Sequence, residues 1–505
     1  MRKSAVFRTA AFALIAAFAA APAVADTTHT TPNPSEMSPS QWRHLQLVAA
    51  DQSDKIMQDA RKQQGLLAQY LFMQTHYDTN HERAFQLIFG QYLSWFQTFI
   101  GDYDGAAASF SIAQPAQPDD ARSPLAGGGA RELEAPALRM SQIVNQTPGT
   151  GMDLFTDRST RAAAADNATA GGWRVEPAAD VILELAKDRK AVFFNEAHSA
   201  PVTRTLTIEL LAKLRAQGFN YFAAETLYRN DKELNQRGYP TPDSGFYIDE
   251  PLYGEMVRTA LKLGFKVLAY DVENAGAGDV RELAGAQNLY HVFKQDPNAR
   301  LVVDAGFAHI QKTGKYLGGS SMAEFFEKMS GIDPLCIEQT MLIQHARPDQ
   351  DHPYYAAIMD ALHPRWPIVF VNGDKTWTLK PKLYDVSVVF PPAQRGDTRP
   401  DWLALRGLRV PYRVGGDMCR GRFPCLIEAH YANEGNDSVP ADRALLNVIQ
   451  PGADLAERVL SDHSTAKSRL FLRPGKYRIT ATDRDNRTIT SRDITVVADA
   501  KDSKP

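Results

Sequence analysis

The chain has 505 residues, of which 44% are hydrophobic and 23% are charged, a balance that is typical of globular proteins. At roughly 150 residues per domain, this length predicts about three domains. The 56 Lys and Arg residues nearly balance the 59 Asp and Glu residues, which leaves a net charge of −3. Binding to a nucleic acid backbone needs a basic surface, so we expect no nucleic-acid partner.

Residues 1–25 have the order of a secretory signal peptide. A basic start at Arg2 and Lys3 is followed by an apolar stretch through Phe18 and by small residues up to Ala25. We expect cleavage after Ala25 and export of the mature protein to the periplasm or out of the cell. No later apolar run approaches the roughly 20 residues of a membrane-spanning helix, so no transmembrane segment is expected.

Residues 26–113 are predicted to form a helical N-terminal region. Apolar residues recur at intervals of three and four from Gln41 to about Tyr77, and again from Glu82 to Ile100. We expect these two helices to form a hairpin that packs against the main domain. Residues 114–172 are rich in Pro, Gly, Ala, Asp and Ser, which predicts a linker or a mobile insertion.

Residues 173–390 alternate between predicted strands and predicted helices. This order predicts an α/β core domain with a mostly parallel sheet flanked by helices, because each strand–helix–strand unit makes a right-handed crossover. The strands are expected at residues 191–195, 221–224, 266–270 and 300–304, and segments 336–343 and 368–371 are expected to extend the sheet.

Residues 391–498 contain short predicted strands separated by turns, which predicts a C-terminal antiparallel β-sandwich. None of the ionisable residues of this segment form a cluster of catalytic character, so we interpret it as an accessory domain that could contribute to stability or contact protein or glycan. Cys419 and Cys425 are close together in the chain, and we expect a disulfide between them in an exported protein. Cys336 is expected to be a buried small residue, and residues 499–505 are expected to form a disordered tail.

Ionisable side chains follow the strands of the predicted α/β core. The carboxyl ends of parallel strands meet at one edge of the sheet, where ligands bind in such folds. Glu196 and His198 end the first of these strands two positions apart, so their side chains point to the same side. The ends of the next strands supply Glu225, then Asp271 and Glu273, then His309. We therefore predict one site to which several strands contribute.

Two kinds of chemistry are open to such a cluster. Two histidines and two or more carboxylates can hold a divalent metal that leaves one position for water. The same residues can work without a metal if a carboxylate orients an imidazole that activates water. Taken alone, Asp271 and Glu273 are by default solvated loop carboxylates, and His309 could be a buried histidine with satisfied hydrogen bonds.

Two arginines are expected near the starts of helices that face the site. Arg204 and Arg281 could pair with its carboxylates or bind an anion, or they could simply cover their helices. Arg204, Asp271 and Glu273 are therefore candidates for contact with a cofactor. Aromatic residues after Glu225, Tyr247 among them, are placed where an insertion could form the wall of an apolar pocket.

The same residues carry a resemblance to known families. The string Phe194-Asn195-Glu196-Ala197-His198, followed by Arg204, Glu225, Arg281-Glu282, Asn288 and Ala308-His309, resembles the superfamily of erythromycin esterase-like hydrolases, ChaN-like haem-binding lipoproteins and TIKI/TraB-type proteins. The resemblance covers about residues 190–312. It implies a central site of Glu196, His198, Glu225 and His309, supported from a helix by Arg281, Glu282 and Asn288.

One position departs from the pattern of these families. Asn195 stands where they usually have Gly, a residue that permits a positive φ or a close approach of the backbone. Asn is the next most tolerant residue for positive φ, so we expect the site to be kept while the substrate differs.

We expect an exported hydrolase that activates water at this Glu/His cluster, with or without a divalent metal, to cleave an ester or amide bond in a small-molecule or peptide substrate. In this interpretation His198 is the general base or a metal ligand, and Arg281 stabilises developing negative charge. The alternative is a ChaN-like protein that binds haem or another cofactor without turnover. A third interpretation is an interaction module in which the helical hairpin and the sandwich surround an inactive site.

Overall fold

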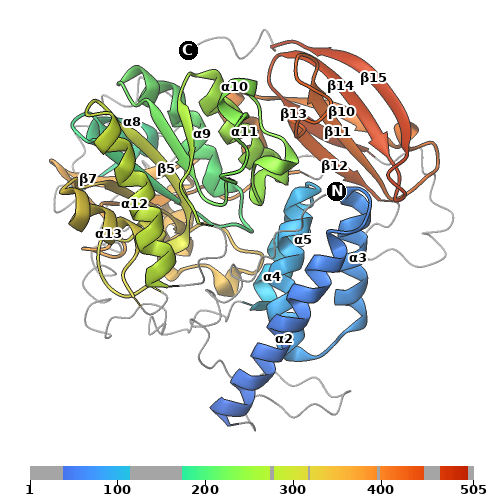
Figure 1. Ribbon diagram of the computed structural model, residues 1–505, viewed down its shortest axis with the longest axis horizontal. Helices are drawn as coiled ribbons and strands as arrows, with labels where there is room; N and C mark the ends of the chain where they lie inside the picture. The colour runs from blue at the N-terminus through green and yellow to red at the C-terminus, as the bar shows by residue number, and fades with distance from the viewer. Residues whose placement is uncertain are drawn as a thin grey trace.

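The computed structural model describes residues 38–113, 173–272, 278–316, 319–394, 399–447 and 467–498. The expected signal peptide, the 114–172 linker and the 499–505 tail lie outside these residues. Figure 1 shows three parts: N-terminal helices in blue, a central α/β region in green to orange, and C-terminal strands in red. Within the described segments, no helix has the combination of length and hydropathy that a transmembrane span requires.

The described N-terminal region contains four helices, where a hairpin of two was expected. The first, α2 (Pro39–Ala60), begins at Ser38, whose hydroxyl accepts a hydrogen bond from the backbone N–H of Gln41. The long helix expected over residues 41–77 is broken at Gly65, which has a φ of 88° that favours glycine. The chain continues in α3 (Leu66–Thr79), α4 (Arg83–Phe99) and α5 (Tyr103–Ala113), and α4 packs against the other three.

The central region is built on one nine-stranded sheet with the order β1-β7-β9-β6-β2-β5-β3-β4, in which β8 pairs with β7. The strands from β9 to β4 in this order are parallel, in agreement with the predicted fold class. An antiparallel edge formed by β1, β7 and β8 is not predicted by the sequence patterns. The strands are β1 (Arg174–Pro177), β2 (Ala191–Glu196), β3 (Tyr221–Ala224), β4 (Lys266–Ala269), β5 (Leu301–Gly306), β6 (Leu335–Leu342), β7 (Ile368–Asn372), β8 (Lys375–Thr376) and β9 (Val386–Val389).

Helices cover both faces of this sheet. Val192 and Phe194 of β2 join one apolar core with α8, α9 and α11, whereas Ala191 and Phe193 join a second core with α12 and α13. Successive residues of a strand point to opposite faces, so a strand that is buried on both sides forms a continuous apolar run. The helices are α8 (Ala178–Ala186), α9 (Val202–Ala216), α10 (Leu234–Arg237), α11 (Pro251–Lys262), α12 (Asp279–Gln295), α13 (Met322–Ser330) and α14 (Pro353–Leu362).

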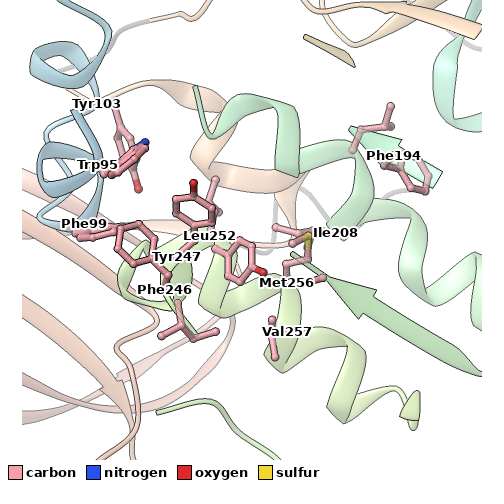
Figure 2. Packing of buried hydrophobic residues seen from close by; sticks show 14 of the residues in the cluster. Trp95, Phe99, Tyr103, Phe194, Ile208, Phe246, Tyr247, Leu252, Met256 and Val257 are labelled. Atoms are coloured by element: carbon pink, nitrogen blue, oxygen red, sulfur yellow. The ribbon is translucent and has the colours of Figure 1, made fainter. Parts of the chain in front are cut away.

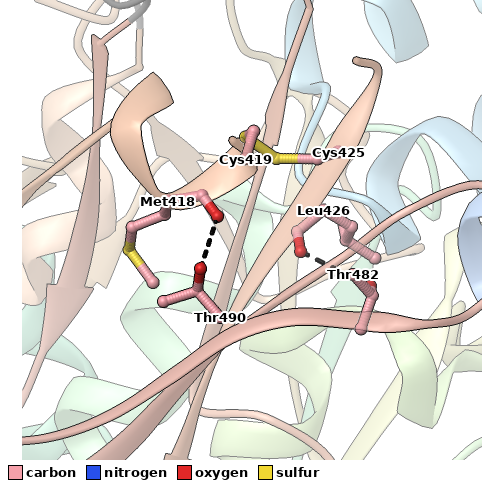
Figure 3. The surroundings of a disulfide bond; sticks show 6 residues. All are labelled: Met418, Cys419, Cys425, Leu426, Thr482 and Thr490. Carbon is pink, nitrogen blue, oxygen red and sulfur yellow. Dashed lines mark hydrogen bonds between the residues drawn. A yellow bond between two sulfur atoms is a disulfide. The ribbon is translucent and has the colours of Figure 1, made fainter. Parts of the chain in front are cut away.

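The C-terminal region consists of two antiparallel sheets that share one apolar core. One sheet pairs β10 with β13, and the other has the order β12-β11-β14-β15. The expected disulfide between Cys419 and Cys425 is present at the start of β11 (Figure 3), and Cys336 is buried as expected. The strands are β10 (Val410–Gly415), β11 (Cys425–Tyr431), β12 (Asp442–Leu446), β13 (Lys467–Leu472), β14 (Gly475–Thr482) and β15 (Thr488–Val496).

Buried charged side chains join the three regions. Arg443 of β12 donates a hydrogen bond to the carbonyl of Phe99, the last residue of α4, at 3.0 Å. Arg258 of α11 pairs with Glu434 of the C-terminal region at 2.8 Å. The helical region and the C-terminal sheets are therefore packed into the same body as the central sheet.

Candidate functional site

The side chains expected at the strand ends gather at one edge of the central sheet. β5 lies between β2 and β3, and all three are parallel, so their carboxyl ends meet. β2 ends in Glu196, Glu225 directly follows β3, and a short 3₁₀ helix after β5 carries His309. The structure buries these three side chains together with His198.

His198 is held by Glu196. Nδ1 of His198 lies 3.0 Å from Oε1 of Glu196, and the same carboxylate accepts two hydrogen bonds from Arg204 in the first turn of α9. Burial would raise the pKa of Glu196, but the Arg204 guanidinium and the His198 ring lower it to about 2. An ionised Glu196 accepts the Nδ1 proton of His198, which leaves Nε2 as the nitrogen that can act as a base.

His309 has a carboxylate partner of its own. Its Nδ1 lies 2.7 Å from Oε2 of Glu282 on α12, and its Nε2 lies 3.5 Å from Oε1 of Glu225. Burial disfavours a charged ring, but the two carboxylates outweigh it and raise the pKa of His309 to about 10. His309 is therefore an imidazolium ion at neutral pH.

Glu225 lies between the two imidazoles. Its Oε2 is 4.0 Å from Nε2 of His198, while its Oε1 faces His309 and accepts a hydrogen bond from Arg281 at 2.7 Å. The backbone N–H of Gly306 donates to Oε2. Burial acts to raise the pKa of Glu225, but His309 and Arg281 hold it well below its ordinary range. Glu225 is therefore ionised and fixed on both oxygens.

The close packing around Glu225 depends on glycine at position 306. A Cβ there would overlap the His198 ring and would lie 2.8 Å from Oε2 of Glu225. The residues that follow Glu225 and Gly306, namely Thr226 and Phe307, have positive φ angles of 60° and 47°. Strained backbone at residues other than glycine is concentrated at functional sites, so the strain of these two turns supports a functional interpretation.

Aromatic rings enclose the cluster. Tyr247 stacks on His198 with the ring centroids 4.3 Å apart, and Phe307 packs edge-on against the same ring at 5.0 Å. Tyr316 packs against His309 at 4.9 Å. A cavity of about 10 Å³ beside His309 has room for about one water molecule. Tyr247 belongs to the aromatic segment after Glu225 that the sequence analysis places at a pocket wall.

The residues predicted on helix α12 and in the loop after β4 have different roles in the site. Arg281 bridges Glu225 and Asp271, at 2.7 and 2.6 Å, so Asp271 is an ion-pair partner within the site and its default interpretation as a solvated loop residue is wrong. Asn288 donates to the backbone carbonyl of the residue before Asp271 at 2.7 Å and so secures the end of β4. Glu273 lies outside the described residues.

Arg204 supports the site through buried ion pairs. It is completely buried, and besides Glu196 it donates to Glu250 at 2.7 Å. Two carboxylates engage the guanidinium, so Arg204 pairs with the carboxylates of the site, one of the roles expected for it, and its contact with a cofactor stays a prediction. The sequence does not predict Glu250 as a site residue, because its only signal is a place before Pro251 at the start of a helix.

Asn195 does not have a positive φ. The sequence suggests one, because Asn195 stands where the similar families usually have Gly. Asn195 lies in the extended strand β2, and its side chain donates to the carbonyl of Phe307 at 2.8 Å. Its side-chain oxygen accepts from the backbone N–H of Gln339 on β6 at 2.6 Å. Asn195 therefore ties two strands to the strained turn that precedes His309.

Two further residues of the site, Gly306 and Asp304 on β5, are not predicted from the sequence. Asp304 lies within an apolar strand and accepts a hydrogen bond from the hydroxyl of Thr207 at 2.9 Å. Burial and the neighbouring charge of Glu196 raise the pKa of Asp304 well above its ordinary value. A carboxylate inside an otherwise apolar strand is the sequence signal that points to Asp304, because a buried carboxylate needs a partner.

The donor atoms of the cluster are engaged with one another and with Arg281 in this arrangement. Both oxygens of Glu225 accept hydrogen bonds, from Arg281 and from the backbone N–H of Gly306, and Nδ1 of His309 is paired with Glu282. Across the described ranges, no group of three or more His, Cys, Asp or Glu side chains is arranged to hold a metal.

Comparison with known proteins leaves the family open. No family model and no curated protein sequence matches the chain. A crystal structure of RRSP, a MARTX toxin effector domain from Vibrio vulnificus CMCP6, aligns at 17% identity and a TM-score of 0.23, over 44% of this chain and 50% of that chain. Two structures described as bacterial protein toxins align at 17% and 14% identity with TM-scores of 0.26 and 0.24, over 48% and 47% of this chain and 56% and 55% of theirs. The chain spans about half the length of these structures, and TM-scores this low support no conclusion about fold or function.

Proposed function

We propose that the protein is a hydrolase that activates water at the Glu196, His198, Glu225 and His309 cluster and cleaves an ester or amide bond. One observation carries this proposal. Two imidazoles, each paired through Nδ1 with its own carboxylate, present their Nε2 atoms to the two oxygens of Glu225. One ring can accept a proton and the other is a cation, so a base and an electrostatic stabiliser lie within one buried site.

In the proposed reaction His198 is the general base. A water molecule gives a proton to Nε2 of His198 while its oxygen attacks the substrate carbonyl. The His309 imidazolium and the Arg281 guanidinium stabilise the oxyanion that forms. When the intermediate breaks down, the leaving alcohol or amine takes the proton from His198, which restores the neutral ring.

The carboxylates hold these groups in their charge states. Glu196 fixes the tautomer of His198, and Glu225 with Glu282 keeps His309 protonated. Arg204 and Arg281 supply positive charge beside the carboxylates, a role that a metal would otherwise fill. We therefore propose a reaction without a metal.

Two broader parts of the proposal come from the sequence. The resemblance to the erythromycin esterase, ChaN and TIKI/TraB superfamily supports hydrolysis at the same four positions, and the enclosing aromatic rings favour a small-molecule or peptide substrate over a bulky one. The signal-like pattern of residues 1–25 supports action in the periplasm or outside the cell.

A panel of ester and peptide substrates tests the proposal. We expect hydrolysis by the wild-type protein and a loss of at least about 100-fold in His198→Asn and Glu225→Gln, the size of effect typical of general acid–base residues. His345→Asn is the matched control, because His345 is also paired with a carboxylate, Asp351, at 3.1 Å. Hydrolysis that survives in His198→Asn, or a wild-type protein inactive on the whole panel, would overturn the proposal.

A further inference from the structure

A chain of buried hydrogen bonds joins the helical region to the site. The hydroxyl of Tyr103 on α5 donates to Oε1 of Glu250 at 3.0 Å, across 147 positions of the chain. Arg204 donates to Oε2 of Glu250 at 2.7 Å and to Oε1 of Glu196 at 2.9 Å. That oxygen of Glu196 is the one that lies 3.0 Å from Nδ1 of His198. The first residue of α5 is therefore connected to the proposed base.

Glu250 is the junction of this chain, and both of its oxygens are fully engaged. Oε1 accepts from Tyr103 and from the backbone N–H of Leu252 at 3.0 Å. Oε2 accepts from Arg204 and from the backbone N–H of Tyr253 at 2.7 Å. Glu250 is completely buried. Removal of one donor would take one of four hydrogen bonds from this buried carboxylate, so the carboxylate and the guanidinium bound to it would have to shift.

Aromatic contacts follow a second route from the helical region to the same imidazole. Trp95 on α4 packs edge-on against Tyr247 with the ring centroids 6.1 Å apart, and Tyr247 stacks on His198 at 4.3 Å. Figure 2 shows Trp95 and Tyr103 beside Phe246 and Tyr247, where the helical region meets the central domain. These contacts restrain the ring plane of His198, while the hydrogen-bond chain restrains its Nδ1 partner.

We propose that Tyr103 is a positioning residue for His198 and that the N-terminal helical region is part of the active site. By holding Glu250, Tyr103 fixes Arg204, and Arg204 fixes the Glu196 carboxylate that accepts the Nδ1 proton of His198. The role of His198 as a base rests on the proposed function, whereas the relay to its ring can be measured without any substrate.

Tyr103→Phe removes only the hydroxyl, and Tyr92→Phe is its matched control. Tyr92 is also a buried residue of the helical region whose hydroxyl donates to a carboxylate, that of Asp54, at 2.6 Å. We would record ¹⁵N NMR spectra of histidine-labelled full-length protein at one fixed pH and assign the His198 signals with His198→Asn. Tyr103→Phe is expected to shift both ring nitrogens of His198, whereas Tyr92→Phe leaves them in place.

A second variant protects the test against a folding defect. Glu250→Gln breaks the same relay and should shift the His198 signals as well. Unchanged His198 signals in both Tyr103→Phe and Glu250→Gln would overturn the relay, whatever the protein hydrolyses. With a hydrolysed substrate in hand, Tyr103→Phe should lower kcat by about tenfold at unchanged KM. Shifted signals together with a wild-type protein that hydrolyses nothing would uphold the relay and overturn only the proposed function.

Discussion

The Nδ1 atom of His309 lies 2.7 Å from Oε2 of Glu282, a residue 27 positions earlier that reaches it from α12. Glu225 faces the other nitrogen of the same ring, so His309 has carboxylates on both sides. His198 differs, because Glu196 lies close to its Nδ1, whereas Nε2 of His198 is 4.0 Å from Glu225. The two histidines of the cluster therefore have different tasks, one as a fixed cation and the other as a base.

The charge of His309 predicts a pH-dependent contribution to stability. Its pKa rises from 6.5 to about 10 on folding, so the native protein keeps a proton that the unfolded chain releases between these values. The stabilisation by Glu282 and Glu225 is complete below about pH 6.5 and is lost as the pH rises through 10, at up to about 1.4 kcal/mol per pH unit. Arg281, also close to the ring, stays charged over this range.

His309→Asn should therefore lower the free energy of unfolding more at about pH 6 than at about pH 10. Urea titrations of the wild-type protein and the variant at several pH values measure this difference. A difference that is the same at every pH would show that folding does not raise the pKa of His309.

Gly306→Ala should abolish hydrolysis while the protein still folds. The added methyl group would overlap the His198 ring and displace Glu225, and small displacements of catalytic groups cost about 100-fold in rate. Gly285→Ala on α12 is the control, because the nearest neighbour of its added Cβ would lie at an ordinary 3.4 Å. Kinetics and circular dichroism of both variants are the measurements, and normal rates in Gly306→Ala would contradict the geometry of the site.

Arg204→Gln should lower the free energy of unfolding by about 3–5 kcal/mol, because Glu196 and Glu250 would be left as buried carboxylates without their partner. Lys55→Gln should change it by less than about 0.5 kcal/mol, since Lys55 and its partner Asp51 are 70% and 71% exposed. Chemical denaturation measures both values. Equal small effects would mean that Arg204 does not support the site.

The sequence predicts the parallel sheet well, for a physical reason. A strand such as β2 is buried on both faces, so residues 191–194 form an apolar run that stands out from the helices around it. The short edge strand β1 (Arg174–Pro177) is only partly buried and carries charged residues, and its pairing with β7 comes from residues almost 200 positions away. Such an antiparallel edge leaves no comparable local pattern.

The candidate site also contains some residues that the sequence predicts and others that it does not. Glu196, His198, Glu225 and His309 can be predicted because each follows an apolar strand, and parallel strands end at a common edge. Glu250 and Tyr103 cannot be predicted from the strand pattern, because their roles depend on how α11 and α5 pack against the sheet. Asn195 shows a different limit of prediction from sequence. The sequence suggests a special backbone conformation at this position, whereas in the structure the side chain of Asn195 makes hydrogen bonds that hold the site.

The most direct test of water activation by the cluster is to measure hydrolysis by chelator-treated wild-type protein in parallel with hydrolysis by His198→Asn. We predict that metal-free wild-type protein keeps its full rate on a responsive ester or peptide and that His198→Asn loses at least about 100-fold. A wild-type rate that disappears with the chelator and returns with a divalent metal, or a His198→Asn rate equal to that of the wild type, would contradict it.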